Sequence, residues 1–351
     1  EFADRIRTEM RLLQERFETG EKLIELLRKS PPAGLGRDDA WGLSDHIVGG
    51  DDESLLDSPM SIPPLFGVGD YQVFHADGNT NSMMDRNLAQ EVALGAQVSS
   101  EDATGLDLHQ IHLANQMVAL IEGPEWPDFF PELDEAKVRL GQEVFERKSY
   151  EDYRVWDWYR RELQSERVSC ADCHQNPDSA EEQRYYDVGT SPLRARHYQE
   201  KEGMLETVTG RLGRIYEATK ERGGYGTFEA WSWERGQTPW WRVQEGYVAR
   251  ALDGIWASPP YFYNASIPTL EDLFKPVGER ARSFYVGNLE YDVMRVGYST
   301  EKAEGAELFV VDEGMNTNKG HEFGAELEAE ERSALIEYLK TFSRGKRGLG
   351  D

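Results

Sequence analysis

The chain contains only two cysteines, and they lie three positions apart with a histidine directly after the second, in the segment Cys170-Ala171-Asp172-Cys173-His174. Two thiols one helical turn apart lie on the same side of a helix, where they can form thioether bonds to the two vinyl groups of a haem. The histidine that follows then directs its imidazole at the iron. The spacing therefore predicts one covalently attached haem c, with His174 as the proximal iron ligand.

Two other uses of this spacing explain the segment less well. A structural zinc site needs four nitrogen or sulfur ligands, and the sequence offers no third cysteine, only scattered histidines. A thioredoxin-type dithiol has the same spacing but does not need His174. Because haem is attached to c-type cytochromes outside the cytoplasm, we expect a periplasmic or extracellular protein.

The charge balance excludes one class of partner. Lysine and arginine number 39 against 65 for aspartate and glutamate, which gives a net charge of −26 over 351 residues. Phosphates need cations, so a nucleic-acid partner is excluded, and a cationic redox partner protein is expected. Apolar residues at 39% and aromatic residues at 11% indicate a globular chain. No stretch reaches the roughly 18 to 20 apolar residues of a transmembrane segment.

Hydrophobic spacings of three, four and seven predict most of the secondary structure. A short aromatic strand is expected at 71–74, and proline-rich breaks at 124–131 place the domain boundary there. We therefore expect a mostly α fold, with an N-terminal helical domain over 1–125 and a cytochrome c-like haem domain with long irregular loops over 126–351. Gly141 is expected where two helices cross closely, with an ordinary packed helix that tolerates one glycine as the alternative. The Trp-rich segment 222–247 is expected where loops surround a cofactor. Helices are predicted at 1–29, 82–96, 106–122, 134–148, 150–163 and 325–342.

Two blocks of the sequence resemble a known family. The segments 252–261 (LDGIWASPPY) and 264–270 (NASIPTL) resemble a block of the bacterial di-haem cytochrome c peroxidase superfamily, especially its rubber oxygenase (latex-cleaving) branch. The segments 285–288, 296–298 and 316–324 resemble the tail of the same domain. Upstream, 63–66, 74–79 and 87–90 are similar to the second half of that superfamily's first haem domain. The resemblance covers roughly residues 31–343.

The chain also departs from the family pattern. Family members carry two C-x-x-C-H motifs, and this chain has only the second. The first haem was lost, lies on a separate haem-bearing chain, or belongs to a segment that is not part of this sequence. Ala265 stands where the family usually has glycine, and Tyr263 where histidine is common.

The second axial ligand is open among several side chains. By resemblance, His321, which follows Gly320, looks like the distal histidine of the family's C-terminal haem. Two imidazoles stabilise ferric iron, so this pair implies a low-potential, six-coordinate haem for electron transfer. The alternatives are His46, His75, His109, His112, His197, Met294, Met315 or an empty position.

Four further assignments follow. Arg250 is a candidate partner for a haem propionate, with an ordinary surface arginine as the alternative. Trp256 is a candidate to pack on the haem edge, with a core position as the alternative. His109 and His112, three positions apart, form a weak candidate metal pair. The segment 77–81 is similar to a calcium loop, although turn chemistry explains it better.

The resemblance and the motif together imply a c-type cytochrome that transfers electrons within a di-haem peroxidase-like or oxygenase-like system. One alternative is a haem enzyme that reduces peroxide or activates dioxygen, which makes it an oxidoreductase. Another is an electron-transfer subunit of a multihaem assembly. The motif does not decide whether the chain is an enzyme.

Overall fold

The computed structural model describes residues 20–22, 24–30, 32–39, 59–93, 107–150, 153–157, 159, 161–163, 167–174, 182–196, 246–312 and 314–343. The expectations for residues 1–19 and for the Trp-rich segment up to residue 245 lie outside these ranges. His46 and His197 lie outside them too. Positions 20–22 and 24–29 are helical, in agreement with the end of the helix predicted at 1–29.

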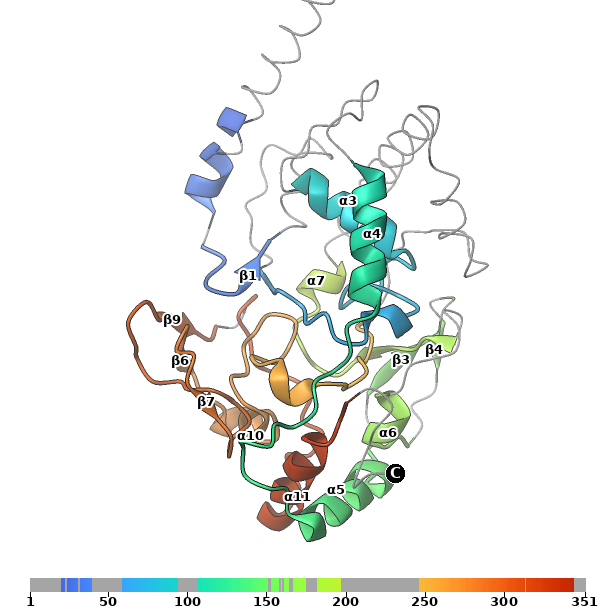
Figure 1. Ribbon diagram of the computed structural model, residues 1–351, viewed down its shortest axis with the longest axis vertical. Coiled ribbons are helices and arrows are strands. Elements are labelled where there is room, and N and C mark those ends of the chain that lie inside the picture. Colours follow the sequence, from blue (N-terminus) through green and yellow to red (C-terminus); the bar gives the residue numbers. More distant parts are fainter. Residues whose placement is uncertain are drawn as a thin grey trace, which may run out of the picture.

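Two helices pack closely at one end of the molecule, α5 (Glu135–Arg147) and α11 (Ala329–Leu339) (Figure 1). Asp134 begins α5 because its carboxylate accepts hydrogen bonds from the backbone N–H groups of the first turn. A Cβ on Gly141 would lie 2.0 Å from the carbonyl oxygen of Ala334, so only glycine allows this crossing. The predicted close approach at Gly141 and both helix predictions are confirmed.

A second helical pair lies at the other end of the described structure. It consists of α3 (Met83–Ala93) and α4 (Leu108–Ala119), with the 3-10 helix η2 (Val68–Asp70) against α4. Asp107 accepts a hydrogen bond from the N–H of Gln110 and so begins α4. The helices predicted at 82–96 and 106–122 are therefore confirmed over Met83–Ala93 and Leu108–Ala119.

The strands are short and pair in four small antiparallel sheets. The central sheet has the order β4-β3-β5, in which Val155 lies opposite both Leu163 and Tyr186. Two-stranded sheets form from β1 with β2, β6 with β9, and β7 with β8. The strand bounds are β1 (Arg37–Asp38), β2 (Met60–Ser61), β3 (Arg154–Trp156), β4 (Glu162–Leu163), β5 (Tyr185–Asp187), β6 (Ser283–Val286), β7 (Tyr291–Asp292), β8 (Gly297–Tyr298) and β9 (Glu307–Val310).

Single helical turns link these units: α6 (Cys170–Cys173), α7 (Leu193–Arg196), α10 (Leu270–Leu273), and the 3-10 turns η4 (Ile255–Ala257) and η5 (Val277–Glu279). The hydrophobic core joins α5, α10 and α11, with Leu335 and Phe342 each 1% exposed. Burying a side chain of this size contributes about 1.5–3 kcal/mol. Within the described residues, no helix combines the length and the hydropathy that a membrane span requires.

The prediction of a mostly α fold is wrong. The structure is only about 33% helical, with roughly 15% strand and much irregular chain. The helix expected at 150–163 is absent, because Arg154–Trp156 and Glu162–Leu163 pair as strands with each other and with Tyr185–Asp187. The expected strand at 71–74 is only a single bridge between Phe74 and Thr80. Aromatic and β-branched residues favour strands once a partner is present, and partners distant in sequence leave no periodic signal.

Candidate haem site

The cysteine pair lies on the single turn of α6, which has its own local cap. The Ser169 hydroxyl accepts a hydrogen bond from the backbone N–H of Asp172, and the Asp172 carboxylate accepts one from the N–H of Ser169 at 2.7 Å. This reciprocal capping box stabilises a helix too short to persist alone. The turn therefore places Cys170 and Cys173 together at the wall of one cavity.

Both thiols are free and largely enclosed. Burial raises the pKa of Cys170 to about 12 and that of Cys173 to about 11. The hydroxyl of Tyr186, on β5, also interacts with Cys173. Both sulfurs are therefore uncharged near neutral pH and face a largely apolar space.

His174 ends α6 and is oriented by a backbone group. Its backbone N–H donates to the carbonyl of Cys170, and the ring nitrogen Nδ1 lies 2.7 Å from the carbonyl oxygen of Arg250. A carbonyl can only accept, so Nδ1 must carry a proton, and in the neutral ring Nε2 then keeps its lone pair. Metal-binding histidines are commonly oriented by a hydrogen bond of this kind.

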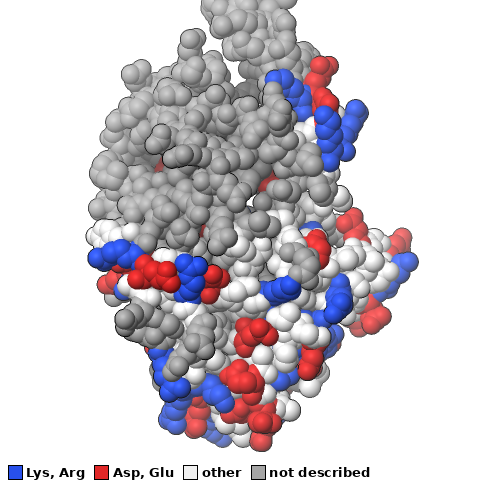
Figure 2. All heavy atoms as spheres, turned by 180° about the vertical axis from the view of Figure 1, so that it is seen from behind, with Lys and Arg blue, Asp and Glu red and all other residues white. Residues whose placement is uncertain are grey.

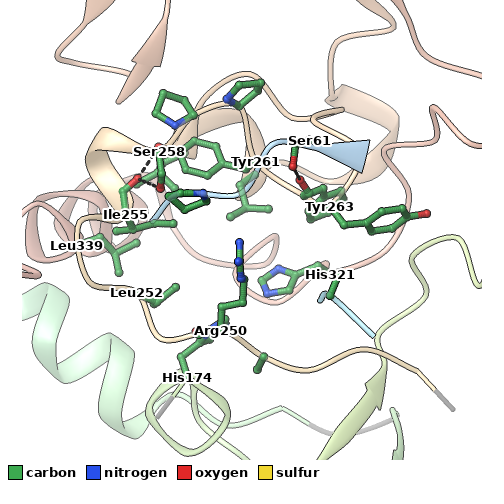
Figure 3. A pocket seen from close by; sticks show the side chains of 18 of the residues that line it. Ser61, His174, Arg250, Leu252, Ile255, Ser258, Tyr261, Tyr263, His321 and Leu339 are labelled. Atoms are coloured by element: carbon green, nitrogen blue, oxygen red, sulfur yellow. Dashed lines mark hydrogen bonds between the residues drawn. The ribbon is translucent and has the colours of Figure 1, made fainter. Parts of the chain in front are cut away.

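His321 lies across the cavity from His174 (Figure 3). Its backbone has a φ of +47°, directly after Gly320 at +83°, and its N–H donates to the carbonyl of Val188 at 2.7 Å. The imidazole is enclosed by the edges of Phe262 and Phe323. Burial, with further effects from His174 and Arg280, lowers the pKa of His321 to about 3, so the ring is neutral.

The distance between the two imidazoles fits one metal ion between them. The ring centroids of His174 and His321 are 6.1 Å apart. Two imidazoles on opposite sides of one metal place their centroids about 6.2–6.4 Å apart, since each bond is about 2.0–2.1 Å and each ring nitrogen is about 1.1 Å from its centroid. The buried Nδ1 of His321 has no hydrogen-bond partner among the described residues.

The cavity between the rings has a volume of about 620 Å³ and a largely apolar lining. That volume is in the range typical of cofactor sites. Residues from both sides of the predicted boundary at 125 line it, including Leu35, Ile62, Tyr71, Phe145, Leu252, Tyr261 and Leu339. The two thiols, the two imidazoles and this apolar space together fit a haem c.

Arg250 supplies a cationic group to the same cavity. Figure 3 shows its side chain extending from the His174 side into the cavity, to the left of His321 in this view. Its guanidinium carbon lies 5.8 Å from the ring centroid of Tyr71. Burial, and after it the positive charges of Arg86, Arg194 and Arg250, hold the pKa of His75 well below its usual range. This wall of the cavity is therefore suited to an anionic group.

Trp256 is placed elsewhere. It is not among the residues that line the cavity, and its Nε1 donates to the carbonyl of Pro124 at 2.9 Å. Its ring packs edge-on against Trp126 and Tyr291 in the aromatic core. Trp256 therefore occupies a core position, the alternative to packing on the haem edge, and contacts the 123–126 segment.

The other candidate ligands in the described part of the chain do not line the cavity. His75 Nδ1 is 2.8 Å from Asn79 Oδ1, and Met294 is 72% exposed. On α4, His112 is buried while His109 is exposed. Met315 is half-buried, and its carbonyl accepts a hydrogen bond from Asn264.

The described residues contain no group of three or more His, Cys, Asp or Glu that could hold a metal ion. The Asp77 carboxylate accepts a hydrogen bond from Asn79 at 3.2 Å and lies 3.5 Å from the guanidinium of the fully buried Arg194. In the predicted calcium loop, Asp77 is therefore engaged in contacts within the protein.

The segment that resembles the family holds the His321 loop in place. Asn264 donates to the carbonyls of Met315 and Thr317, and the Ser266 hydroxyl also donates to Thr317. Ala265, at the usual glycine position, has a φ of +60°, the left-handed region that favours glycine. Tyr263, at the position where histidine is common, stacks on Tyr247, and both hydroxyls donate to the carbonyl of Ser191.

Sequence reasoning did not single out Tyr186, Phe262 or Phe323 around the site. In sequence they are indistinguishable from core aromatics. Arg280, beside the His321 loop, was missed as well, because no motif marks it.

The family model described as RoxA-like, cytochrome c-like matches residues 246–285. This match supports a relation to the rubber oxygenase and di-haem cytochrome c proteins, and a domain of this class implies covalently bound haem c. The matched segment contains Arg250, Asn264, Ser266 and Arg280.

Two relatives from Sinorhizobium fredii (strain NBRC 101917 / NGR234) are similar to parts of the chain. The uncharacterized protein y4iJ is 45% identical over 104 residues, which covers 27% of this chain and 17% of y4iJ. The uncharacterized protein y4iM is 48% identical over 59 residues, which covers 17% of this chain and 13% of y4iM. The matches thus span only a small part of either relative.

Proposed function

We propose that the chain is a c-type cytochrome with one haem c bound through Cys170 and Cys173, and with His174 and His321 as the axial ligands. The observation that carries the proposal is the 6.1 Å separation of the two imidazoles across a cavity that both thiols line. The haem would supply an iron that changes between the ferric and ferrous states. The proposed reaction is electron transfer within a di-haem peroxidase-like or oxygenase-like system.

The residues of the chain would each contribute to this role. The Arg250 carbonyl keeps the proton of His174 on Nδ1, which leaves Nε2 available to the iron. Burial keeps His321 neutral, so no proton competes for its lone pair. The Arg250 guanidinium would balance a haem propionate. The largely apolar lining offers water few hydrogen-bond partners in the space between the rings.

The presence of two histidines favours electron transfer over peroxide or dioxygen chemistry at this haem. If His174 and His321 both held the haem, neither would leave a place for a small oxidant to bind. We infer an extracytoplasmic protein, because the covalent attachment of haem c takes place there.

The net charge of −26 suggests a cationic redox partner. On the face seen in Figure 2, acidic and basic side chains of the described residues are interspersed. A cationic partner would therefore be attracted by the summed electrostatic field of the protein rather than by one acidic patch on that face.

The test is the visible spectrum of the holoprotein with His321→Gly. Glycine suits the left-handed backbone at this position, so the loop should persist while the imidazole is lost. The wild-type haem should be low-spin and should not bind carbon monoxide, whereas the variant should be high-spin and bind it. His112→Ala, a buried histidine of α4, is the control and should match the wild type. A low-spin spectrum that is unaltered in His321→Gly would refute the ligand assignment.

A further inference from the structure

A buried arginine next to the His321 loop uses every one of its hydrogen-bonding nitrogens on backbone carbonyls. Arg280 follows η5 and is only 3% exposed. On one side it binds the end of α10, where Nε donates to the carbonyl of Lys275 and Nη2 to that of Leu273, both at 3.0 Å. Arg280 is thereby anchored to the hydrophobic core, because α10 packs against α11.

On its other side Arg280 binds the loop that carries His321. Nη1 donates to the carbonyls of Asn318 and Gly320, and Nη2 donates to the carbonyl of His321 at 3.2 Å. The guanidinium carbon also lies 5.7 Å from the ring centroid of Phe262, which contacts the His321 imidazole. The cation therefore touches both the backbone of His321 and one wall of its ring.

These contacts match a requirement of the loop. Gly320 and His321 both have positive φ, a conformation that regular secondary structure does not support. Buried carbonyls need a donor, and a missing hydrogen bond is costly. Arginine presents five N–H donors in a fixed plane, whereas lysine has three on a flexible stem. Only arginine can therefore bind all five carbonyls together.

The charge of Arg280 is not neutralised by a close carboxylate. Among the described residues, its hydrogen bonds go to carbonyls alone, and Glu322 and Asp272 act on it only through longer-range attraction. An arginine that served simply as an ion-pair partner would contact one of these acids. The contacts instead favour a role in shaping the backbone.

We propose that Arg280 is the positioning residue that fixes the 318–321 loop, so that the His321 imidazole stays opposite His174. The proposal rests on the proposed role of His321 as the axial ligand. Loss of the carbonyl contacts should let the loop move away from the cavity, so that His321 would no longer occupy its place at the haem. External ligands should then gain access, although His321 itself is unchanged.

The experiment compares three holoprotein variants by spectrum, carbon monoxide binding and hydrogen exchange of the 316–324 segment. Arg280→Lys keeps the charge but has too few donors. Arg295→Lys is the matched control, because Arg295 also binds α10, through Glu271 at 2.8 Å and Asp272 at 2.7 Å, but its side-chain hydrogen bonds within the described residues go to these two acids and not to the 318–321 loop. His321→Gly reports the spectrum of the site without its ligand. Should Arg280→Lys fail to fold, Arg280→Gln, which keeps a planar donor group, takes its place.

We expect Arg280→Lys to increase the carbon monoxide-accessible fraction at least about tenfold and to speed exchange at 316–324. Added imidazole should restore its low-spin spectrum, and the double variant with His321→Gly should resemble His321→Gly alone. Arg295→Lys should lower stability without either change.

Wild-type ligand access in Arg280→Lys, or the same access in Arg295→Lys, would overturn the proposal. An unaltered spectrum in His321→Gly would instead refute the ligand assignment. In that case hydrogen exchange still tests whether Arg280 fixes the 318–321 loop. Faster exchange at 316–324 in Arg280→Lys, but not in Arg295→Lys, would support that role, and unchanged exchange in Arg280→Lys would overturn it.

Discussion

Gly320→Ala measures how closely the His321 loop must approach the opposite wall of the site. Gly320 has a φ of +83°, and a Cβ there would lie 2.3 Å from the carbonyl carbon of Gly189 and 2.3 Å from the nitrogen of Thr190. Both are backbone atoms, so no side-chain rotation can relieve the overlap. The left-handed conformation should cost about 1–2 kcal/mol. The forced separation should add about 1–3 kcal/mol.

Gly305→Ala provides the matched control, because Gly305 has a similar φ of +77° but a Cβ added there would meet nothing within 4 Å. It should lose only the conformational cost, about 1–2 kcal/mol. The assay is urea unfolding followed by tryptophan fluorescence, with the visible spectrum recorded in parallel. Gly320→Ala should be the less stable by about 1–3 kcal/mol and should show a high-spin fraction that Gly305→Ala lacks. Equal losses of stability and identical spectra would refute the close approach.

Two further predictions concern stability away from the cavity. Gly141→Ala should lower the free energy of unfolding by about 1–3 kcal/mol, because the new methyl would lie 2.0 Å from the carbonyl oxygen of Ala334. The control is Gly278→Ala, whose added Cβ would meet nothing within 4 Å and should change the free energy of unfolding by under about 0.5 kcal/mol. Similar losses of stability in both variants would contradict the close helix crossing. Asp85→Asn should stabilise the protein above pH 6, because burial raises the pKa of Asp85 to about 6. Between about pH 4 and 6 the folded wild type holds a proton that the unfolded chain has released. The stabilisation that this proton gives the wild type is lost as the pH rises through that range, whereas asparagine does not ionise. Since the side chain is partly exposed, the gain in urea unfolding should be about 1–2 kcal/mol at pH 8 and should vanish near pH 4, relative to the exposed control Asp128→Asn; a gain independent of pH would contradict the assignment.

The parts of the fold that sequence predicts are those determined by neighbouring residues. The four longer helices follow from spacings within one segment and from local caps such as Asp134. The arrangement of Cys170, Cys173 and His174 follows in the same way, because Ser169 and Asp172 cap the turn on which the thiols lie.

The parts that sequence did not predict depend on distant pairings. Strand β3 exists because Tyr185–Asp187 pairs with it some thirty residues later, and nothing within 150–163 distinguishes it from an aromatic helix. His321 could be singled out only through resemblance to a family. Its placement depends on Val188 and on Arg280, whose five acceptors are backbone carbonyls and therefore leave no mark in the sequence.

The proposed function requires one haem to be bound covalently to Cys170 and Cys173. The most direct measurement is the intact mass of the purified chain together with its reduced pyridine haemochrome spectrum. The proposed function predicts the mass of one added haem, a haemochrome typical of two thioether bonds, and the loss of both in the double variant Cys170→Ser and Cys173→Ser. A chain expressed with haem-attachment machinery that carries no haem, or a haem that survives the loss of both cysteines, would contradict the proposal.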